Sequence, residues 1–249
     1  MAEETNIIGP IALHQYQHNK NSGFGNHLFC NFLARALSIE YDQPLLSWLH
    51  TKICTDKDHY DRLDNDDWGN SWAYIDHNYS EGEISLVAGD HDFGYGTWYH
   101  QNEKSIKLVK KHRESLLNDF GKRDGVFAHI RLGDLLPNTT RICDYEYYRR
   151  CLSGLGPGYI TSDSPNEYLV QLLLSEFDLE LYEGTPEETI IFGSMFENKV
   201  LSMGTFSWAI GFIGNQNNVI HPSPEDYENW HGPLFELMEN WNPVSRPYE

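Results

Sequence analysis

VFAHIRLGD, the sequence of residues 126–134, joins an apolar strand to a charged turn, and the other segments of the chain are organised around it. Apolar residues dominate from Val126 to Ile130, as in a short buried strand, and Gly133 permits a turn after it. Arg131 therefore stands at a strand end, which is where ligands bind in open α/β sheets. Its planar guanidinium is suited to two oxygens of a phosphate group. The same residues are also compatible with an ordinary ion-paired turn.

Strand-like and helix-like segments alternate through the C-terminal half of the chain. Alternation at this spacing predicts an α/β fold with a parallel sheet flanked by helices. The predicted strands are 126–131, 158–162, 179–182, 199–202 and 219–222, the predicted helices are 144–154, 165–176, 187–197 and 205–212, and residues 224–241 form a tail with a helical stretch.

The N-terminal half begins with a different pattern. A strand is predicted at 7–15, a glycine-containing loop at 19–26 and a helix at 28–38. This order aims backbone N–H groups and a helix dipole at an anion. The spacing Gly-x-Gly-Asn within the loop is not the fingerprint of dinucleotide-binding proteins, so it does not predict a dinucleotide cofactor.

The domain boundary is predicted from the middle of the chain. Residues 105–120 form the pattern of a basic amphipathic helix, and residues 121–125 are typical of a linker. A chain of 249 residues is long enough for two small domains. We expect one domain at 1–123 and a second at 124–249.

Composition excludes some classes of partner. The 37 acidic and 18 basic residues give a formal net charge of −19, which disfavours nucleic acid and anionic membranes as partners. An anionic ligand then needs a local cationic pocket. The first residues do not form the pattern of a signal peptide, no apolar run approaches the ~20 residues of a membrane span, and the four cysteines have no C-x-x-C spacing. We expect a soluble, cytoplasmic protein without a membrane span.

Several segments resemble motifs of the α-1,2-fucosyltransferase type of glycosyltransferase, and they occur in that family's order. The HIRLGD segment is similar to the signature His-x-Arg-Arg-Gly-Asp, with Leu132 where the family usually has a second arginine. The other matching segments are GFGNHLF at 23–29, ARAL at 34–37, WYHQNEK at 98–104, YITSD at 159–163 and SMGTFSW at 202–208. The resemblance covers most of residues 20–222.

This resemblance implies a fold, a reaction and a donor. The fold is GT-B-like, with two Rossmann-like domains facing a cleft, the N-terminal one holding the glycan acceptor and the C-terminal one the nucleotide sugar. The family transfers L-fucose from GDP-β-L-fucose to a sugar hydroxyl with inversion, and it needs neither a metal nor another cofactor. Leu132 stands where the family usually has an arginine. The alternative of a related transferase that uses another sugar nucleotide, such as one that carries xylose or rhamnose, therefore stays open.

The candidate donor-binding residues gather around the expected diphosphate. Arg131 is predicted to stabilise the charge that develops on the leaving group. Each of the others has a structural alternative: a turn for Asn26, a cap of the following helix for Asp163, and an N-cap for the hydroxyls of helix 205–212. The donor-binding candidates are Arg131, Gly25, Asn26, Asp163, Thr205 and Ser207.

The remaining candidates concern catalysis and the acceptor. Asp134 is near the expected position of a general base, although it can also simply orient Arg131, and His129 is a second catalytic candidate that can instead pack beneath the site. Trp98 and Tyr99 are typical of a platform for sugar rings, with core packing as the alternative. Glu103 is a further candidate on the acceptor side.

Two other classes of protein stay open. A metal-dependent transferase would use Asp64-x-Asp66 or Asp90-x-Asp92 to hold a divalent cation, and a carbohydrate-binding relative would have lost catalysis. The histidines have no zinc-ligand spacing. Residues 51–82 and 135–143 are expected to select the acceptor, since loops carry such variation. The oligomeric state is not predicted.

Overall fold

The computed structural model describes residues 23–42, 45–47, 51–55, 60–62, 101–136, 139–226 and 234–246. The chain divides into two compact units, Met1–Asn118 and Asp119–Glu249, and each is described by itself. The predicted strand at 7–15 lies outside the described residues. Among the helices that the structure describes, none is both long and apolar enough to span a membrane.

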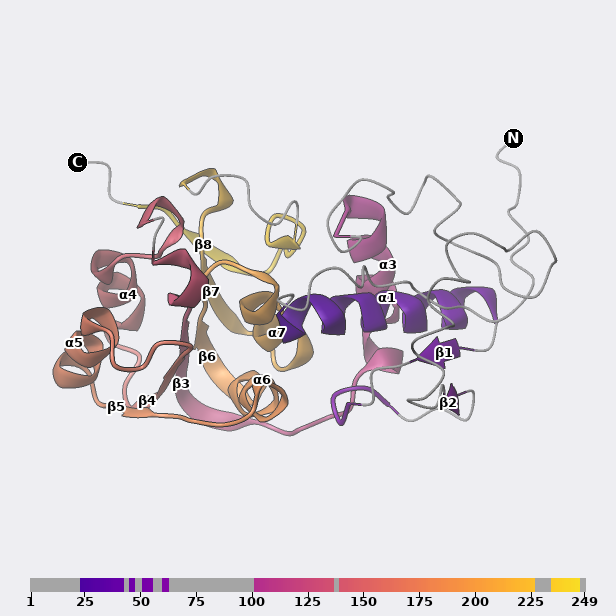
Figure 1. Ribbon diagram of the computed structural model, residues 1–249, viewed down its shortest axis with the longest axis horizontal. Helices are drawn as coiled ribbons and strands as arrows, with labels where there is room; N and C mark the ends of the chain where they lie inside the picture. The colour runs from indigo at the N-terminus through magenta and orange to yellow at the C-terminus, as the bar shows by residue number, and fades with distance from the viewer. Residues whose placement is uncertain are drawn as a thin grey trace. The chain divides into compact units, whose positions relative to one another are not determined.

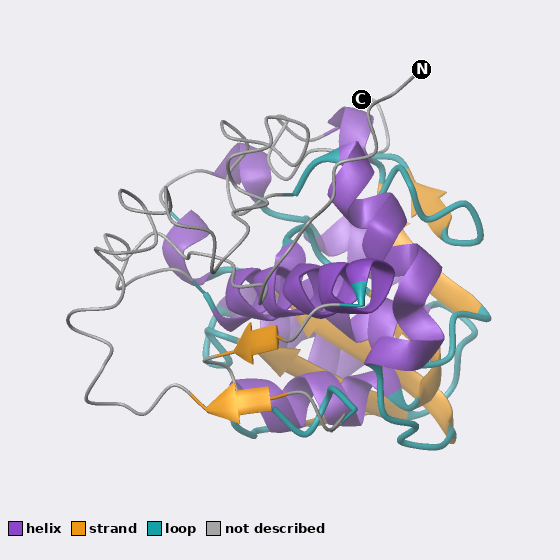
Figure 2. Ribbon diagram, turned by 90° about the vertical axis from the view of Figure 1, so that its right-hand side faces the viewer, coloured by secondary structure: helices purple, strands orange, loops and turns teal. Residues whose placement is uncertain are grey.

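In the first unit, the described residues form two helices and a two-stranded parallel sheet. Helix α1 (Phe24–Tyr41) is longer than the helix predicted at 28–38, and its central residues are buried on every side. Helix α3 (Glu103–Leu116) confirms the second predicted helix and ends before Phe120. Strands β1 (Leu45–Ser47) and β2 (Tyr60–Arg62) run in the same direction (Figure 2).

Helices α1 and α3 lie side by side and run in the same direction. At their first turns, the Gln101 side chain donates a hydrogen bond to Asn26 Oδ1 at 3.0 Å. Nearer their C-terminal ends, Glu40 of α1 contacts Lys111 at 2.7 Å and His112 at 2.5 Å on α3. Hydrogen bonds from Lys111 and, to a smaller extent, His112 hold the pKa of the Glu40 carboxyl below its usual value. The positive ends of the two helix dipoles therefore meet near Asn26.

The second unit contains a six-stranded sheet in which every pair of neighbours is parallel. The strand order is β5-β4-β3-β6-β7-β8. The strands are β3 (Arg123–Ile130), β4 (Gly158–Ser162), β5 (Leu179–Leu181), β6 (Phe196–Val200), β7 (Asn218–Pro222) and β8 (Asn242–Val244). The chain steps outward from β3 to β5 on one side, then returns to β6 and steps outward on the other. This is the doubly wound order of the Rossmann fold, whose direction switches between β3 and β6.

Helices cover both faces of this sheet. Helices α4 (Tyr145–Leu152) and α5 (Tyr168–Glu176) lie on one face, and α6 (Pro186–Ser194) and α7 (Thr205–Ile213) lie on the other (Figure 1). Short 3-10 helices occupy Gly133–Leu135, Thr139–Arg141 and Pro224–Asp226. The prediction of an α/β fold with a parallel sheet is confirmed for this unit.

Two local predictions were wrong, and one strand was missed. Arg123 belongs to β3 and not to a linker, because its backbone N–H donates to Met195 O at 2.8 Å. Strand β6 begins at Phe196, where the sequence pattern predicts a helix up to residue 197. The polar residues Glu197 and Asn198 hide the start of this strand, so the strand predicted at 199–202 overlaps β6 only at Val200 and the fully buried Lys199. Strand β8 was not predicted, and it is a short edge strand with a proline in the middle.

Candidate functional site

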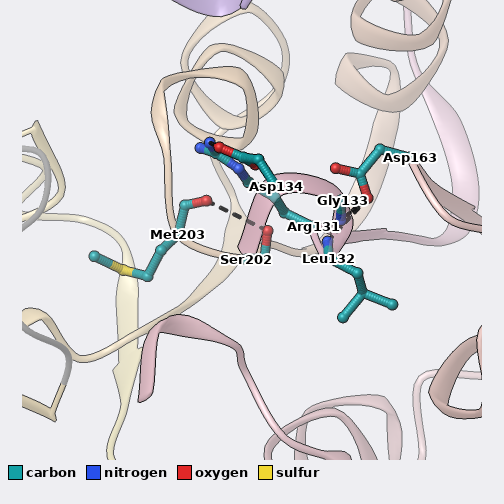
Figure 3. A network of polar contacts seen from close by, with 7 residues as sticks. All are labelled: Arg131, Leu132, Gly133, Asp134, Asp163, Ser202 and Met203. Carbon is teal, nitrogen blue, oxygen red and sulfur yellow. Dashed lines mark hydrogen bonds and ion pairs between the residues drawn. The ribbon is translucent and has the colours of Figure 1, made fainter. Parts of the chain in front are cut away.

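The candidate site lies at the carboxyl ends of β3 and β6, which is the switch point of the sheet. Arg131 directly follows β3, and Ser202, Met203 and Gly204 lie between β6 and α7 (Figure 3). In open α/β sheets, ligands bind in the crevice outside the strand ends at this point. The structure thus brings together the HIRLGD and SMGTFSW segments, which are about 70 residues apart in the sequence.

The guanidinium of Arg131 lies between a carboxylate and the beginning of α7. Its Nη2 atom donates to both oxygens of Asp134, at 3.2 and 3.1 Å. Asp134 is 67% exposed, so this ion pair is weak and an anionic ligand can displace it. The Nη1 atom lies 2.6 Å from the position that a Cβ atom would take on Gly204. Arg131 is therefore held against the first turn of the helix.

Helix α7 directs its positive end toward the same place. Its N-cap, Gly204, has φ +115° and makes no side-chain capping bond. The bond from Trp208 N to Gly204 O at 3.0 Å begins the helix, so the backbone N–H groups of its first turn point out of its N-terminal end. Both the N–H groups and the helix dipole favour an anion here. Thr205 and Ser207 themselves are buried, and neither caps the helix through its hydroxyl.

Asp163 links the ends of β3 and β4. Its Oδ1 atom accepts the backbone N–H groups of Leu132 at 2.9 Å and Gly133 at 3.0 Å (Figure 3). A Cβ atom on Gly133 would lie 2.5 Å from Oδ2, so the close approach requires glycine. The alternative that Asp163 caps the following helix is wrong, because the N-cap of α5 is Glu167. Asp163 instead holds the turn that presents Arg131, and its contact with a donor stays a prediction.

Leu132, which stands where the resembled family usually has a second arginine, is buried. Its backbone N–H is bonded to Asp163 while its side chain is 2% exposed. The turn therefore presents one arginine, Arg131, toward the switch point. The Leu132 side chain is buried in the protein and does not contribute to an anion site.

His129 lies beneath Arg131 and is almost fully buried. Its Nδ1 atom is 2.6 Å from Ser207 Oγ and 3.4 Å from Ser202 Oγ. Burial, with a smaller contribution from the charge of Arg131, lowers the pKa of His129 from 6.5 to about 3. The ring is therefore neutral near pH 7, so it is neither a charged phosphate ligand nor a protonated acid.

In the first unit, the structure joins two of the predicted segments. Asn26, in the first turn of α1, accepts the hydrogen bond from Gln101, which the choice of site residues from the sequence did not include. The side chain of Gln101 is buried, and its place two residues before Glu103 was the signal available in the sequence. Glu103 is exposed and forms an ion pair with Lys107, and Gly25 is buried.

Some predicted site residues lie outside the described residues. Trp98 and Tyr99 are among them, and so are the aspartate pairs of the metal-dependent alternative. Within the described ranges, no group of three or more His, Cys, Asp and Glu side chains is arranged to hold a metal ion.

The site at the switch point combines a fixed guanidinium, a helix N-terminus and a glycine that leaves space between them. This chemistry suits a group with two or more negative charges, such as a diphosphate. Searches of family models, curated proteins and solved structures found no significant match to this chain. Residues and geometry therefore carry the functional argument.

Proposed function

We propose that this chain is an inverting, metal-independent glycosyltransferase that transfers L-fucose from GDP-β-L-fucose to a hydroxyl of a glycan. The observation that carries the proposal is the position of Arg131 against the first turn of α7, at the switch point of a Rossmann-type sheet. The positive charge of this site supports a diphosphate as part of the ligand. We infer the identities of the sugar and of the nucleobase from the resemblance of the HIRLGD and SMGTFSW segments to the fucosyltransferase motifs.

In the proposed reaction, the bond between the sugar C1 atom and the β-phosphate oxygen breaks while the acceptor oxygen bonds to C1 from the opposite face. The hydroxyl proton leaves to a base, for which Asp134 is the candidate, and GDP departs. Negative charge develops on the β-phosphate, and preorganised cations and dipoles lower the energy of that transition state. Arg131 and the first turn of α7 would supply both.

The finer architecture belongs to the same proposal. The first unit would form the acceptor side of a GT-B-like enzyme and contribute Glu103 to it, while Gly25 and Asn26 of the same unit would bind the donor. The second unit would bind the nucleotide sugar. A cytoplasmic location would place the enzyme where nucleotide sugars are made.

Nucleotide binding by the purified full-length chain tests the proposal. We would measure affinities for GDP, UDP, CDP, ADP and inorganic pyrophosphate by calorimetry in EDTA. A ligand at ~100 times its Kd adds about 2.7 kcal/mol of stability, so thermal unfolding provides a second readout. GDP is expected to bind, and Arg131→Ala is expected to lose at least about 100-fold in turnover of GDP-β-L-fucose.

The matched control is Arg149→Ala, which removes an exposed arginine on α4 whose partner is Glu146. This variant is expected to bind GDP like the wild type. A preference for UDP would still support a glycosyltransferase, but its donor would then be a UDP-linked sugar. Absence of binding to every nucleotide, or near-normal turnover by Arg131→Ala, would reject the proposed function.

A further inference from the structure

Three buried polar side chains form a cluster directly beneath the proposed diphosphate site. They are His129 on β3, Ser202 after β6 and Ser207 in the first turn of α7, and all are at most 6% exposed. The two hydroxyl oxygens lie 3.1 Å apart, and His129 Nδ1 is within 3.4 Å of each. None of the three is placed to contact a ligand on the surface, so the function proposed above gives this polar cluster no role.

The polar cluster joins the two halves of the switch point. His129 and Arg131 are two residues apart at the end of β3, so their side chains leave the backbone on the same side. Both contact the beginning of α7: Arg131 lies against Gly204, and His129 lies against Ser207, three residues later in the helix. The orientation of the helix relative to the guanidinium therefore depends on both contacts.

The ring of His129 is itself held in a fixed orientation. It packs against the ring of Phe206 with centroids 5.0 Å apart, and its backbone carbonyl accepts a hydrogen bond from Tyr148 Oη at 3.3 Å. On the other side, Ser202 Oγ is 3.4 Å from Met203 O, in the loop that leads to Gly204. Hydrogen bonds thus run from β3 through the polar cluster to the loop and the helix that form the anion site.

We infer that His129 is a positioning residue, which acts through Ser207 and Ser202 to hold the first turn of α7 against Arg131. The N–H groups of the helix and the guanidinium then face one anion before it binds, and such preorganisation increases affinity. This inference rests on the proposed function, and it adds a residue that acts on the diphosphate without touching it.

A purely structural role predicts a different result. If the polar cluster only fills the core, its removal lowers the free energy of unfolding, and the molecules that remain folded bind anions normally. If it positions the helix, affinity falls in the folded protein. Anion affinity measured well below the unfolding temperature therefore separates the two roles.

The test compares the full-length wild type with Ser207→Ala, His129→Phe, the double variant and His129→Asn. The probes are inorganic pyrophosphate and GDP, measured by calorimetry after circular dichroism has shown that each variant is folded. Each variant that removes the contact between His129 and Ser207 is expected to weaken pyrophosphate binding by roughly three- to tenfold. This factor corresponds to the net free energy of one hydrogen bond. The double variant is expected to bind no more weakly than either single variant, because the two changes remove one interaction.

His129→Asn and one additional variant, His221→Asn, sharpen the comparison. His129→Asn keeps a side-chain amide near Ser207 and is expected to bind pyrophosphate within about twofold of the wild type. His221→Asn is the matched control, since His221 is also a buried histidine, but its Nδ1 atom lies 2.9 Å from Pro222 O on β7. It is expected to lower stability without changing affinity.

Nuclear magnetic resonance of the histidine rings keeps the inference testable if a variant does not fold. Saturating pyrophosphate is expected to shift the ring-nitrogen signals of His129 in the wild type and to leave those of His221 unchanged. Unchanged His129 signals, or unchanged affinity in Ser207→Ala and His129→Phe, would overturn the positioning role while GDP binding still supports the proposed function. A wild type that binds neither probe would reject both.

Discussion

The Nη1 atom of Arg131 occupies the space that a side chain on Gly204 would fill, since a Cβ atom there would lie 2.6 Å away. Gly204 also has φ +115°, a conformation that residues with a side chain rarely adopt. One glycine therefore satisfies two requirements at once. It permits the sharp entry into α7, and it lets the guanidinium approach the first turn of that helix.

Gly204→Ala is expected to abolish tight anion binding. The added methyl group displaces the guanidinium, and the backbone strain lowers the free energy of unfolding by about 1–3 kcal/mol. Pyrophosphate calorimetry and urea unfolding measure the two effects. Gly154→Ala is the control, because Gly154 has φ +83° with no atom within 4 Å of the added Cβ. It should lose stability alone, and equal affinities in the two variants would contradict the steric argument.

Asp163→Asn and Asp163→Ala are expected to differ strongly. Asparagine keeps an oxygen for the N–H groups of Leu132 and Gly133, whereas alanine leaves the turn that carries Arg131 without this support. We expect Asp163→Ala to weaken GDP, UDP and pyrophosphate alike by about tenfold, and Asp163→Asn to stay within about threefold of the wild type. A selective loss of GDP binding in Asp163→Asn would show instead that the carboxylate reads the base.

The position of Arg131 at a strand end was predictable from the sequence because the signal is local. An apolar run, a charged residue and a glycine within nine residues define the strand end, and the same pattern places Asp163 after β4. What each side chain contacts depends on which strands pair. Asp163 reaches Leu132 because β3 pairs with β4, and His129 reaches Ser207 because β3 also pairs with β6.

The sequence pattern predicted Lys199 as part of a strand, but it did not predict that this lysine is fully buried. The interior of β6 includes Lys199, whose ammonium donates to the carbonyl groups of Phe196 and Asn215. Such partners make a buried cation tolerable, but they lie in a loop and a strand end that a hydrophobic pattern does not connect. Leu132 is the opposite case, because it is an apolar residue within a charged motif. Its apolar side chain favours an inward orientation, and it is buried.

Asp134→Asn is expected to raise anion affinity. The carboxylate of Asp134 is bonded to Nη2 of Arg131 and competes with a diphosphate for it. Removing the charge of an exposed ion pair changes affinity by about two- to fivefold, and the effect should shrink at high salt. Calorimetry with pyrophosphate at two salt concentrations measures this. A tenfold loss of binding would show that Asp134 chiefly orients the arginine.

Turnover in the same variant addresses the catalytic role of Asp134. A general base contributes at least about 100-fold, so Asp134→Asn should lose that much activity while GDP binding is kept or improved. Retained turnover would remove Asp134 from the catalytic residues and leave it as a partner of Arg131.

Acidification is expected to destabilise the chain through its buried histidines. Burial lowers the pKa of His129 to about 3 and, outweighing a hydrogen bond to the Pro222 carbonyl, that of His221 to about 4, from an ordinary value of 6.5. Below pH 6.5 the unfolded chain therefore binds protons that the folded chain does not. The free energy of unfolding falls as the pH decreases toward these lowered values, and the stabilisation is complete only above pH 6.5.

The contribution of one histidine can be isolated by comparison with its asparagine variant. In His129→Asn, the slope of the free energy of unfolding against pH between 5.5 and 4.5 is expected to be smaller than in the wild type by about 1.4 kcal/mol per pH unit. Urea unfolding at a series of pH values measures the slopes. His221→Asn should reduce the slope similarly, and the double variant should combine both reductions, because His129 lies on β3 and His221 on β7, and β6 separates these two strands in the sheet. An unchanged slope in His129→Asn would mean that the His129 ring takes up its proton as readily in the folded protein as in the unfolded chain.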